Sequence, residues 1–181
     1  IERGWRFYAE RPWAAGCFFW TGFDYRGEPN PLKYPAVDSQ FGILDYAGFP
    51  KDEAWYLKAW WTDETVLHLL PHWNLEGHEG ETVSVWAYSN CDEVELKVNG
   101  KSMGRKAMPR YGHIEWDVTY QPGKLIAVGY RNGKKVKTEV VETTGKATAI
   151  DLSADSDMIK ADNNDVAVVT VALKDKKGRV V

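Results

Sequence analysis

The sequence predicts a mainly β protein, in which an immunoglobulin-like β-sandwich follows a short α/β segment and precedes the start of a second all-β domain. From Thr82 onward, apolar and polar residues alternate with a period of two, as in half-buried strands. Residues 1–62 read instead as helix, strand, long loop and helix. Of the 24 aromatic residues, 17 lie in residues 1–62 and none follows Tyr130. We therefore divide the chain into residues 1–62, 63–145 and 146–181.

The first segment opens with a short helix predicted over residues 2–12. The apolar run "AAGCFFWTGF" then favours a strand buried on both faces, although a buried helix would show the same run. A long loop rich in Gly and Pro leads to "PKDEAWYLKAWW", where Pro50 suits the first turn of a second helix. Helix, strand, loop and helix in this order are typical of an α/β barrel.

The middle segment contains six short alternating runs between residues 82 and 143. Asn99-Gly100 and Asn132-Gly133 separate two pairs of these runs, and Asn-Gly is the preferred sequence of type I′ hairpin turns. Strands of this length and spacing predict an immunoglobulin-like sandwich. Trp86 and Trp116 alternate with polar neighbours, which favours the sandwich core over exposed carbohydrate-binding rings.

The last segment, residues 146–181, begins a further all-β unit with two or three strands and no second layer to cover them. Residue 1 is Ile, and both ends of the chain read as interior positions. We therefore expect a fragment of a longer polypeptide.

Composition excludes several classes of function. The net charge is −3 and the charges are well mixed, so we expect no nucleic-acid partner. No apolar run approaches the roughly 18 to 20 residues of a membrane span, so we expect no membrane partner. Cys17 and Cys91 are too few for a disulfide framework and are interpreted as buried small hydrophobic residues.

Three histidines in "HLLPHWNLEGH" suggest a metal site, because His68 and His72 are four residues apart. Pro71 interrupts the helix that such a spacing requires, and the motif lacks the glutamate of a helical zinc-protease signature. We interpret this stretch, which includes His78, as a linker strand entering the sandwich. We predict neither a metal nor an organic cofactor.

Three stretches of the chain together resemble glycoside hydrolase family 2, the β-galactosidase group. They are "RPWAAGCFFWTGFDYRGEP", "FGILDYAGFPKDEAWYLKAWW" and "HLLPHWNLEGHEGETVSVWAYSNCDEVELKVNGKSMG". The resemblance implies that residues 1–62 are the last strand (16–24), loop and helix of a (β/α)8 barrel, and that residues 63–145 are the following sandwich. It also implies that the tail starts a bacterial immunoglobulin-like domain, and that the longer protein is exported from a bacterium.

The resemblance also assigns substrate-binding residues at the end of the predicted strand, where barrel active sites lie. Trp20 matches the tryptophan that floors the sugar subsite, and the family often has a cis peptide bond after it. Asp24, Tyr25 and Glu28 are expected at the rim, where polar groups bind hydroxyls. The alternatives are a core tryptophan for Trp20, and a solvated loop or a structural salt bridge for Asp24 and Glu28.

The resemblance implies no catalytic residue in this chain. Retaining glycosidases use two carboxyl groups about 5 to 5.5 Å apart, and in this family both glutamates lie on earlier barrel strands, upstream of Ile1. Asp24 and Glu28 are four residues apart across a Gly turn and are not expected to converge. The predicted function is therefore part of a retaining β-glycosidase, β-galactosidase-like and inactive alone, that hydrolyses terminal β-linked sugars.

The expected partners are a carbohydrate substrate and the rest of the catalytic barrel. A strand at 16–24 without its neighbours would be an unpaired edge. We therefore expect residues 1–62 to be disordered, repacked on the sandwich, or paired with a second copy. The alternative function is a non-catalytic carbohydrate-binding or structural module.

Overall fold

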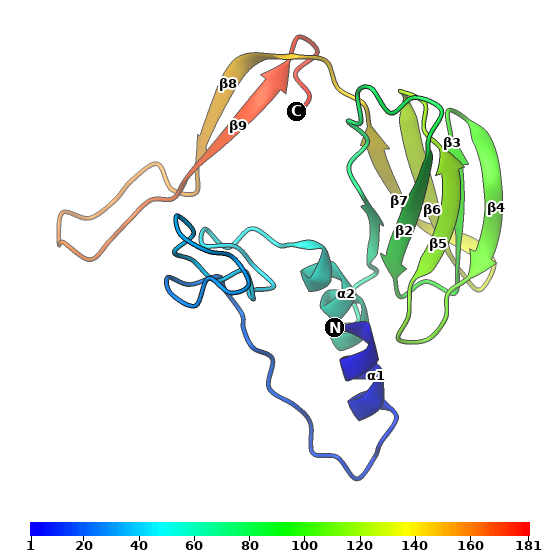
Figure 1. The fold of residues 1–181 in the computed structure, drawn as a ribbon, viewed down its shortest axis with the longest axis horizontal. Helices are drawn as coiled ribbons and strands as arrows, with labels where there is room; N and C mark the ends of the chain where they lie inside the picture. The colour runs from blue at the N-terminus through cyan, green and yellow to red at the C-terminus, as the bar shows by residue number, and fades with distance from the viewer.

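A computed structural model describes residues 1–181 and shows a mainly β chain with two short helices (Figure 1). The helices are α1 (Glu2–Ala9) and α2 (Asp52–Trp61). The strands are β1 (Leu67–Leu70), β2 (Thr82–Ser89), β3 (Glu93–Val98), β4 (Lys101–Ala107), β5 (Ile114–Thr119), β6 (Lys124–Arg131), β7 (Lys134–Glu142), β8 (Ala147–Ala154) and β9 (Val169–Asp175). None of the helices is long and apolar enough to cross a membrane.

The first seven strands form the predicted immunoglobulin-like sandwich. A three-stranded sheet with the order β1-β2-β5 lies against a four-stranded sheet with the order β4-β3-β6-β7, and every pairing is antiparallel. The chain crosses between the sheets after β2, β4 and β5. In β5, buried and exposed residues alternate strictly, which is the period of two seen in the sequence.

Both predicted Asn-Gly hairpins are confirmed. Val98 pairs with Lys101 around the first turn, and Arg131 pairs with Lys134 around the second. The two asparagines have φ angles of 48° and 51°, in the left-handed region that a type I′ turn requires. These turns fix the register of two of the sandwich's strand pairs.

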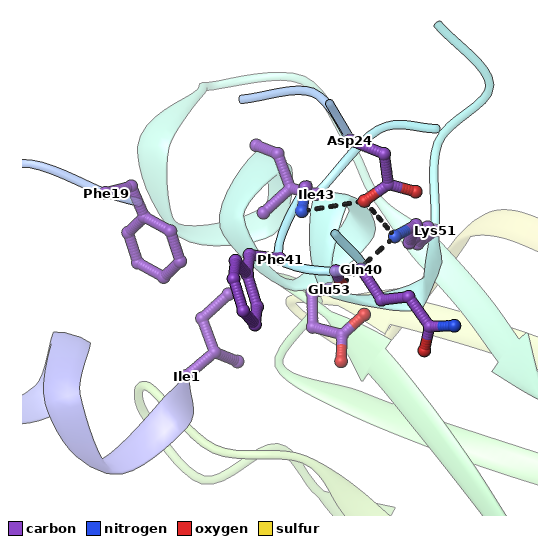
Figure 2. Close-up of a pocket in the computed structure, with 9 residues that line it drawn as sticks. Ile1, Phe19, Asp24, Gln40, Phe41, Ile43, Lys51 and Glu53 are labelled. Carbon is purple, nitrogen blue, oxygen red and sulfur yellow. Dashed lines mark hydrogen bonds and ion pairs between the residues drawn. The ribbon is translucent and has the colours of Figure 1, made fainter. Parts of the chain in front are cut away.

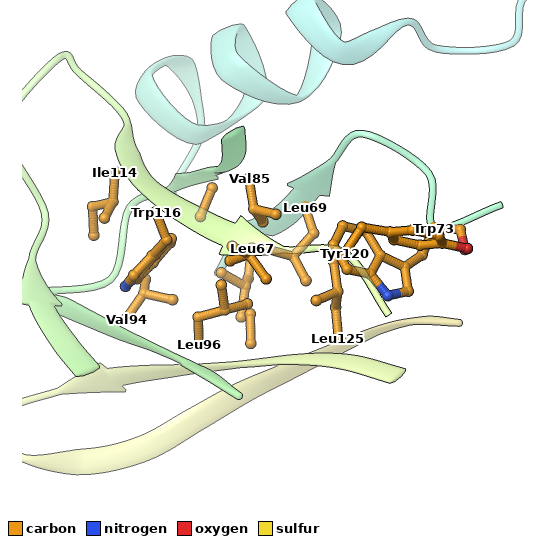
Figure 3. Packing of buried hydrophobic residues seen from close by; sticks show 13 residues of the cluster. Leu67, Leu69, Trp73, Val85, Val94, Leu96, Ile114, Trp116, Tyr120 and Leu125 are labelled. Carbon is orange, nitrogen blue, oxygen red and sulfur yellow. The ribbon is translucent and has the colours of Figure 1, made fainter. Parts of the chain in front are cut away.

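The sandwich core is a cluster of buried apolar side chains between the two sheets (Figure 3). Trp73 and Tyr120 close one end of it, with ring centroids 4.9 Å apart in an edge-to-face arrangement. Trp116 lies in this core, as predicted. Trp86 was wrongly assigned to it: adjacent β2 residues face opposite sides of the sheet, and Trp86 shares the outer face with Tyr88.

Both helices pack on this outer face of the β1-β2-β5 sheet (Figure 1). Tyr56 of α2 is fully buried against Tyr88, and Trp5 of α1 packs against the same cluster. The loop between β4 and β5 contacts both helices. The Tyr111 carbonyl in this loop accepts hydrogen bonds from the Tyr56 hydroxyl (2.9 Å) and from the Arg6 guanidinium (3.4 Å).

His68 links α2 to both sheets. From β1, its Nε2 lies 2.8 Å from Asp52 Oδ1 of α2, and its Nδ1 lies 3.8 Å from Glu139 Oε1 of β7. Its ring stacks on Trp55, with centroids 5.2 Å apart. Burial lowers the pKa of His68, but the carboxylates of Glu139 and Asp52 outweigh burial, and the net pKa is raised.

This geometry predicts that His68 stabilises the helix-to-sandwich contact in a pH-dependent way. Because its folded-state pKa lies above the ordinary value of 6.5, the stabilisation is complete below that pH and is lost as the pH rises through the raised pKa. Thermal unfolding of His68→Gln should therefore show a larger loss of Tm in mildly acidic than in alkaline buffer. His72→Gln, an exposed histidine without a carboxylate partner, is the control, and an equal pH dependence in both variants would contradict the prediction.

His68, His72 and His78 make separate contacts. β1, which begins at Leu67, pairs with β2 as the linker strand expected from this stretch. His72 Nδ1 accepts a hydrogen bond from the Asn74 amide, and His78 Nδ1 lies 2.9 Å from Glu81 Oε2.

The strand predicted at residues 16–24 does not form a ladder. Only its end is paired, through one isolated parallel bridge between Phe23 and Leu44 and four backbone hydrogen bonds between residues 21–24 and 41–44. Residues 16–20 lack a backbone partner in this chain, and a strand requires one to form a ladder.

Residues 1–62 are partly repacked on the sandwich, as expected. Besides the helices, Phe19 is half-buried against the Tyr56–Tyr88 cluster. Phe18 and Trp20 face solvent, however, and Trp20 is 71% exposed. Repacking therefore leaves these two rings uncovered in this chain. Cys91 is buried as expected, whereas Cys17 is only half-buried.

The tail forms a two-stranded sheet, β8-β9, whose apolar face is exposed. Asp175, at the end of β9, fixes this sheet to the sandwich. Its carboxylate accepts hydrogen bonds from the Arg179 side chain (Nε, 2.9 Å) and from the backbone amides of Gly145, Lys177 and Arg179. Arg179 also donates to the Thr143 carbonyl at the end of β7 (2.9 Å). The Arg179 hydrogen bond, followed by that of Gly145, holds the pKa of Asp175 well below its usual range.

Candidate functional site

Three of the four predicted substrate-binding residues lie together in the loops after residue 20. Trp20 Nε1 donates a hydrogen bond to the Tyr25 hydroxyl (3.2 Å), which in turn donates to Glu28 Oε2. The rings of Trp20 and Tyr25 meet edge to face, with centroids 5.9 Å apart. We call Trp20, Tyr25 and Glu28, which are two aromatic rings and the carboxylate bound to them, the aromatic triad.

Local backbone geometry brings Glu28 back to Tyr25. Gly27 and Glu28 have φ angles of 106° and 47°, so the chain reverses there. Tyr25 is held from the other side, because its amide donates to Ser39 Oγ (3.1 Å) and its carbonyl accepts from the Ser39 amide (2.9 Å). Ser39 is buried, so this anchor is protected from water.

The triad combines a fixed edge with an open ring face. The hydrogen bond of Trp20 Nε1 sets the indole orientation, while most of the side chain remains exposed to solvent. The hydrogen bond to Glu28 is the main cause of the raised pKa of Tyr25, so the phenol remains a donor. An indole face suits the apolar C–H face of a pyranose, and the neighbouring carboxylate can accept hydrogen bonds from hydroxyls.

The Trp20–Thr21 peptide bond is cis, as the family resemblance implied.

Asp24, the fourth predicted residue, binds Lys51 and Gly42 and has no contact with the triad side chains (Figure 2 shows its contacts). Its Oδ1 lies 2.7 Å from Lys51 Nζ and accepts a hydrogen bond from the Gly42 amide (2.9 Å). The side chain of Asp24 is 11% exposed, and the Lys51 hydrogen bond is the largest cause of its lowered pKa. Asp24 therefore makes a structural salt bridge, which was one of the two alternatives to sugar binding.

Asp24 and Lys51 line a cleft of about 670 Å³ (Figure 2), and Phe41 in its wall packs against Tyr25 of the triad. Its apolar wall includes Phe19 and Phe41, and its polar wall includes Gln40 and Glu53. The Lys51 ammonium also donates to the Gln40 carbonyl (3.3 Å), so the one lysine of the cleft is already paired. Asp24 and Glu28 each have a different partner, and the structure gives them no contact with each other.

The sequence did not identify Ser39, Phe41 or Lys51 as part of this region. Phe41 packs against Tyr25, with ring centroids 6.4 Å apart. Lys51 follows Pro50 at the start of α2, and nothing in its neighbours indicates a partner 27 residues earlier. Only Ser39 had a local signal, since a small hydroxyl residue in a Pro-rich loop often bonds to backbone.

Part of the sandwich matches a known sequence family. Residues 80–137 match the family described as "Domain of unknown function (DUF4982)". Among curated proteins, the β-galactosidase BoGH2A of Bacteroides ovatus is 44% identical over 169 residues, covering 92% of this chain and 20% of that protein. A β-glucuronidase of Formosa agariphila is 34% identical over 142 residues, covering 76% of this chain and 14% of that protein.

Solved structures match almost the whole chain. A β-glycosidase from Bacteroides vulgatus superposes with a TM-score of 0.92 at 36% identity, covering 99% of this chain and 23% of that one. A glycosyl hydrolase family 2 member from Bacteroides cellulosilyticus gives a TM-score of 0.89 at 32% identity, covering 99% and 28%. The chain spans about a fifth of the length of the β-galactosidase that it matches. The arrangement shared with these structures includes residues 1–62.

Proposed function

This chain belongs to glycoside hydrolase family 2 by the resemblance of its sequence and fold, and we propose that it forms one wall of a β-glycosidase active site. The wall is the aromatic triad, and the ligand is a terminal β-linked sugar, as in a β-galactosidase. The observation that carries this proposal is the solvent-facing Trp20, whose edge is fixed by Tyr25 while its face is open. Asp24 contributes from the adjacent cleft through its second carboxylate oxygen.

The division of the chain is part of this proposal. Residues 1–62 form the end of a (β/α)8 catalytic barrel, residues 63–145 an accessory sandwich, and residues 146–181 the beginning of a further immunoglobulin-like domain. The open faces of Phe18 and Trp20 support this division, because a barrel would supply the neighbours that the segment lacks. In the chain alone, the same exposed rings favour self-association.

Catalysis with retention requires two carboxyl groups about 5 to 5.5 Å apart, one acting as nucleophile and one as acid and base. Asp24 is bound to Lys51 and Glu28 is bound to Tyr25, so these two carboxylates do not form a catalytic pair. We therefore place the catalytic carboxylates in the remainder of the barrel. The chain's own residues bind and orient the sugar.

Replacing the matching segment of the Bacteroides ovatus β-galactosidase with this chain tests the proposal. The chimera should hydrolyse a nitrophenyl β-galactoside, and Trp20→Ala should lower its kcat/KM roughly ten- to hundredfold, because positioning of the sugar is lost. Trp20→Phe should retain more activity than Trp20→Ala. Met158→Ala, an exposed residue of the tail, is the control and should leave activity unchanged.

Two results would contradict the proposal. One is an active chimera in which Trp20→Ala and Met158→Ala behave alike. The other is turnover by the chain alone that disappears in Asp24→Ala, since that would place a catalytic carboxylate in this chain. The alternative, a non-catalytic carbohydrate-binding module, has less support, because the Trp86 ring is covered by His113 at a centroid distance of 4.0 Å.

A further inference from the structure

Two hairpin turns of the sandwich have the same local sequence, Asn-Gly-Lys, at residues 99–101 and 132–134. Both asparagines are exposed and both turns have the same left-handed backbone geometry, with φ angles of 85° and 73° at the two glycines. Neither exposure nor backbone conformation therefore distinguishes the turns.

The side chains of the two asparagines differ in their hydrogen bonds. Asn99 Oδ1 accepts from the Lys124 amide (2.8 Å), and Asn99 Nδ2 donates to the Pro122 carbonyl (3.3 Å). The amide lies directly over Gly123, where an added Cβ would be 1.8 Å from Oδ1. Asn132 is anchored only through its backbone amide, which donates to Asp92 Oδ2 (2.6 Å), and its side-chain amide has no protein partner.

We propose that Asn132 is a site of spontaneous deamidation and that the side-chain hydrogen bonds of Asn99 protect the other turn. The backbone nitrogen of Gly133 gives up its proton to water and attacks Cγ of Asn132. The new N–Cγ bond closes a five-membered succinimide, the Cγ–Nδ2 bond breaks, and the departing nitrogen takes up a proton and leaves as ammonia. Water then opens the succinimide to aspartate or isoaspartate.

The glycine after each asparagine leaves the attacking nitrogen unhindered. In the second turn, the Asn132 side chain is free to rotate toward that nitrogen. In the first turn, the amide must release the Lys124 and Pro122 groups before Cγ can approach Gly100. A reaction that must first break one neutral hydrogen bond of ordinary strength is slowed about fivefold.

Deamidation of Asn132 would change the turn at one edge of the sandwich. The product carries a new carboxylate next to the carboxylate of Asp92, and its isoaspartate form lengthens the backbone between β6 and β7. The β7 strand carries Glu139, which faces His68, and Lys137, whose ammonium donates to the Thr65 carbonyl (2.9 Å). Modification of this turn therefore weakens the edge strand that lies nearest β1. This inference is independent of the proposed function.

Incubation of the chain in mildly alkaline buffer, followed by peptide mapping with mass spectrometry, tests the proposal. In the native chain, Asn132 should convert at least about fivefold faster than Asn99. In concentrated urea, where the hydrogen bonds are lost and the local sequences are the same, the two rates should agree within about twofold. Equal rates in the native chain would overturn the proposal, and so would a difference that persists in urea.

Gly123→Ala provides a second test, because the added Cβ displaces the Asn99 amide. In this variant the native rate at Asn99 should rise toward that of Asn132, while the rate at Asn132 stays as it was. Circular dichroism distinguishes this result from unfolding, in which both rates would reach their values in urea. An unchanged rate at Asn99 in a folded Gly123→Ala chain would contradict the protective role of the hydrogen bonds.

Discussion

Trp73→Ala is expected to lower the free energy of unfolding of the sandwich by about 3 to 5 kcal/mol. Trp73 has no exposed surface, and its indole closes one end of the core against Tyr120. Truncation leaves a cavity between the sheets, and it also leaves the Gln121 carbonyl without the hydrogen bond that Trp73 Nε1 donates (3.1 Å). Urea unfolding followed by circular dichroism measures the change.

Trp13→Ala is the matched control for this prediction. Trp13 is 78% exposed, so its removal should change the free energy of unfolding by no more than about 0.5 kcal/mol. Similar losses in the two variants would mean that Trp73 is not part of the core.

Gly42→Ala is expected to separate the paired backbone segments 21–24 and 41–44. A Cβ at residue 42 would lie 2.2 Å from the Asp24 nitrogen and 2.4 Å from the Leu44 carbonyl oxygen. Because both neighbours are backbone atoms, the segments must move apart, at a cost of about 1 to 3 kcal/mol. Hydrogen-exchange protection of the Asp24, Ile43 and Leu44 amides should fall about ten- to hundredfold.

Gly22→Ala is the control for Gly42→Ala. Gly22 lies in the same segment, two residues before Asp24, but an added Cβ there meets no atom within 4 Å. Its amide protection pattern should match that of the unsubstituted chain. Equal loss of protection in both variants would show that the crossing of the two segments does not depend on the space at residue 42.

The parts of the fold that depend on residues adjacent in the sequence were predictable. Asn99-Gly100 and Asn132-Gly133 fixed two hairpins, because only a few residue pairs tolerate left-handed geometry at both turn positions. Alternation placed Trp116 correctly in the core. Alternation does not show whether the outer face of a sheet is exposed to solvent or covered by another part of the chain. Trp86 was assigned wrongly because it lies on the outer face, which the helices cover.

The candidate site was predictable only in part. The family resemblance supplied Trp20, Tyr25 and Glu28, and their mutual contacts follow from a reversal at Gly27 that is encoded locally. The partner of Asp24 could not be predicted, because Lys51 is distant in sequence and a charge pattern does not specify which opposite charge it meets. Likewise, the run at residues 16–24 has strand-like composition, but a ladder requires strands that this chain does not contain.

The β4–β5 loop connects the sandwich to both helices. Tyr111 in this loop is bound by Tyr56 of α2 and by Arg6 of α1, and α1 leads into the segment that carries Trp20. The loop therefore ties the sandwich to the segment that carries Trp20. Under the function proposed above, an insertion in this loop, far from the bound sugar, is a route by which such a domain alters specificity during evolution.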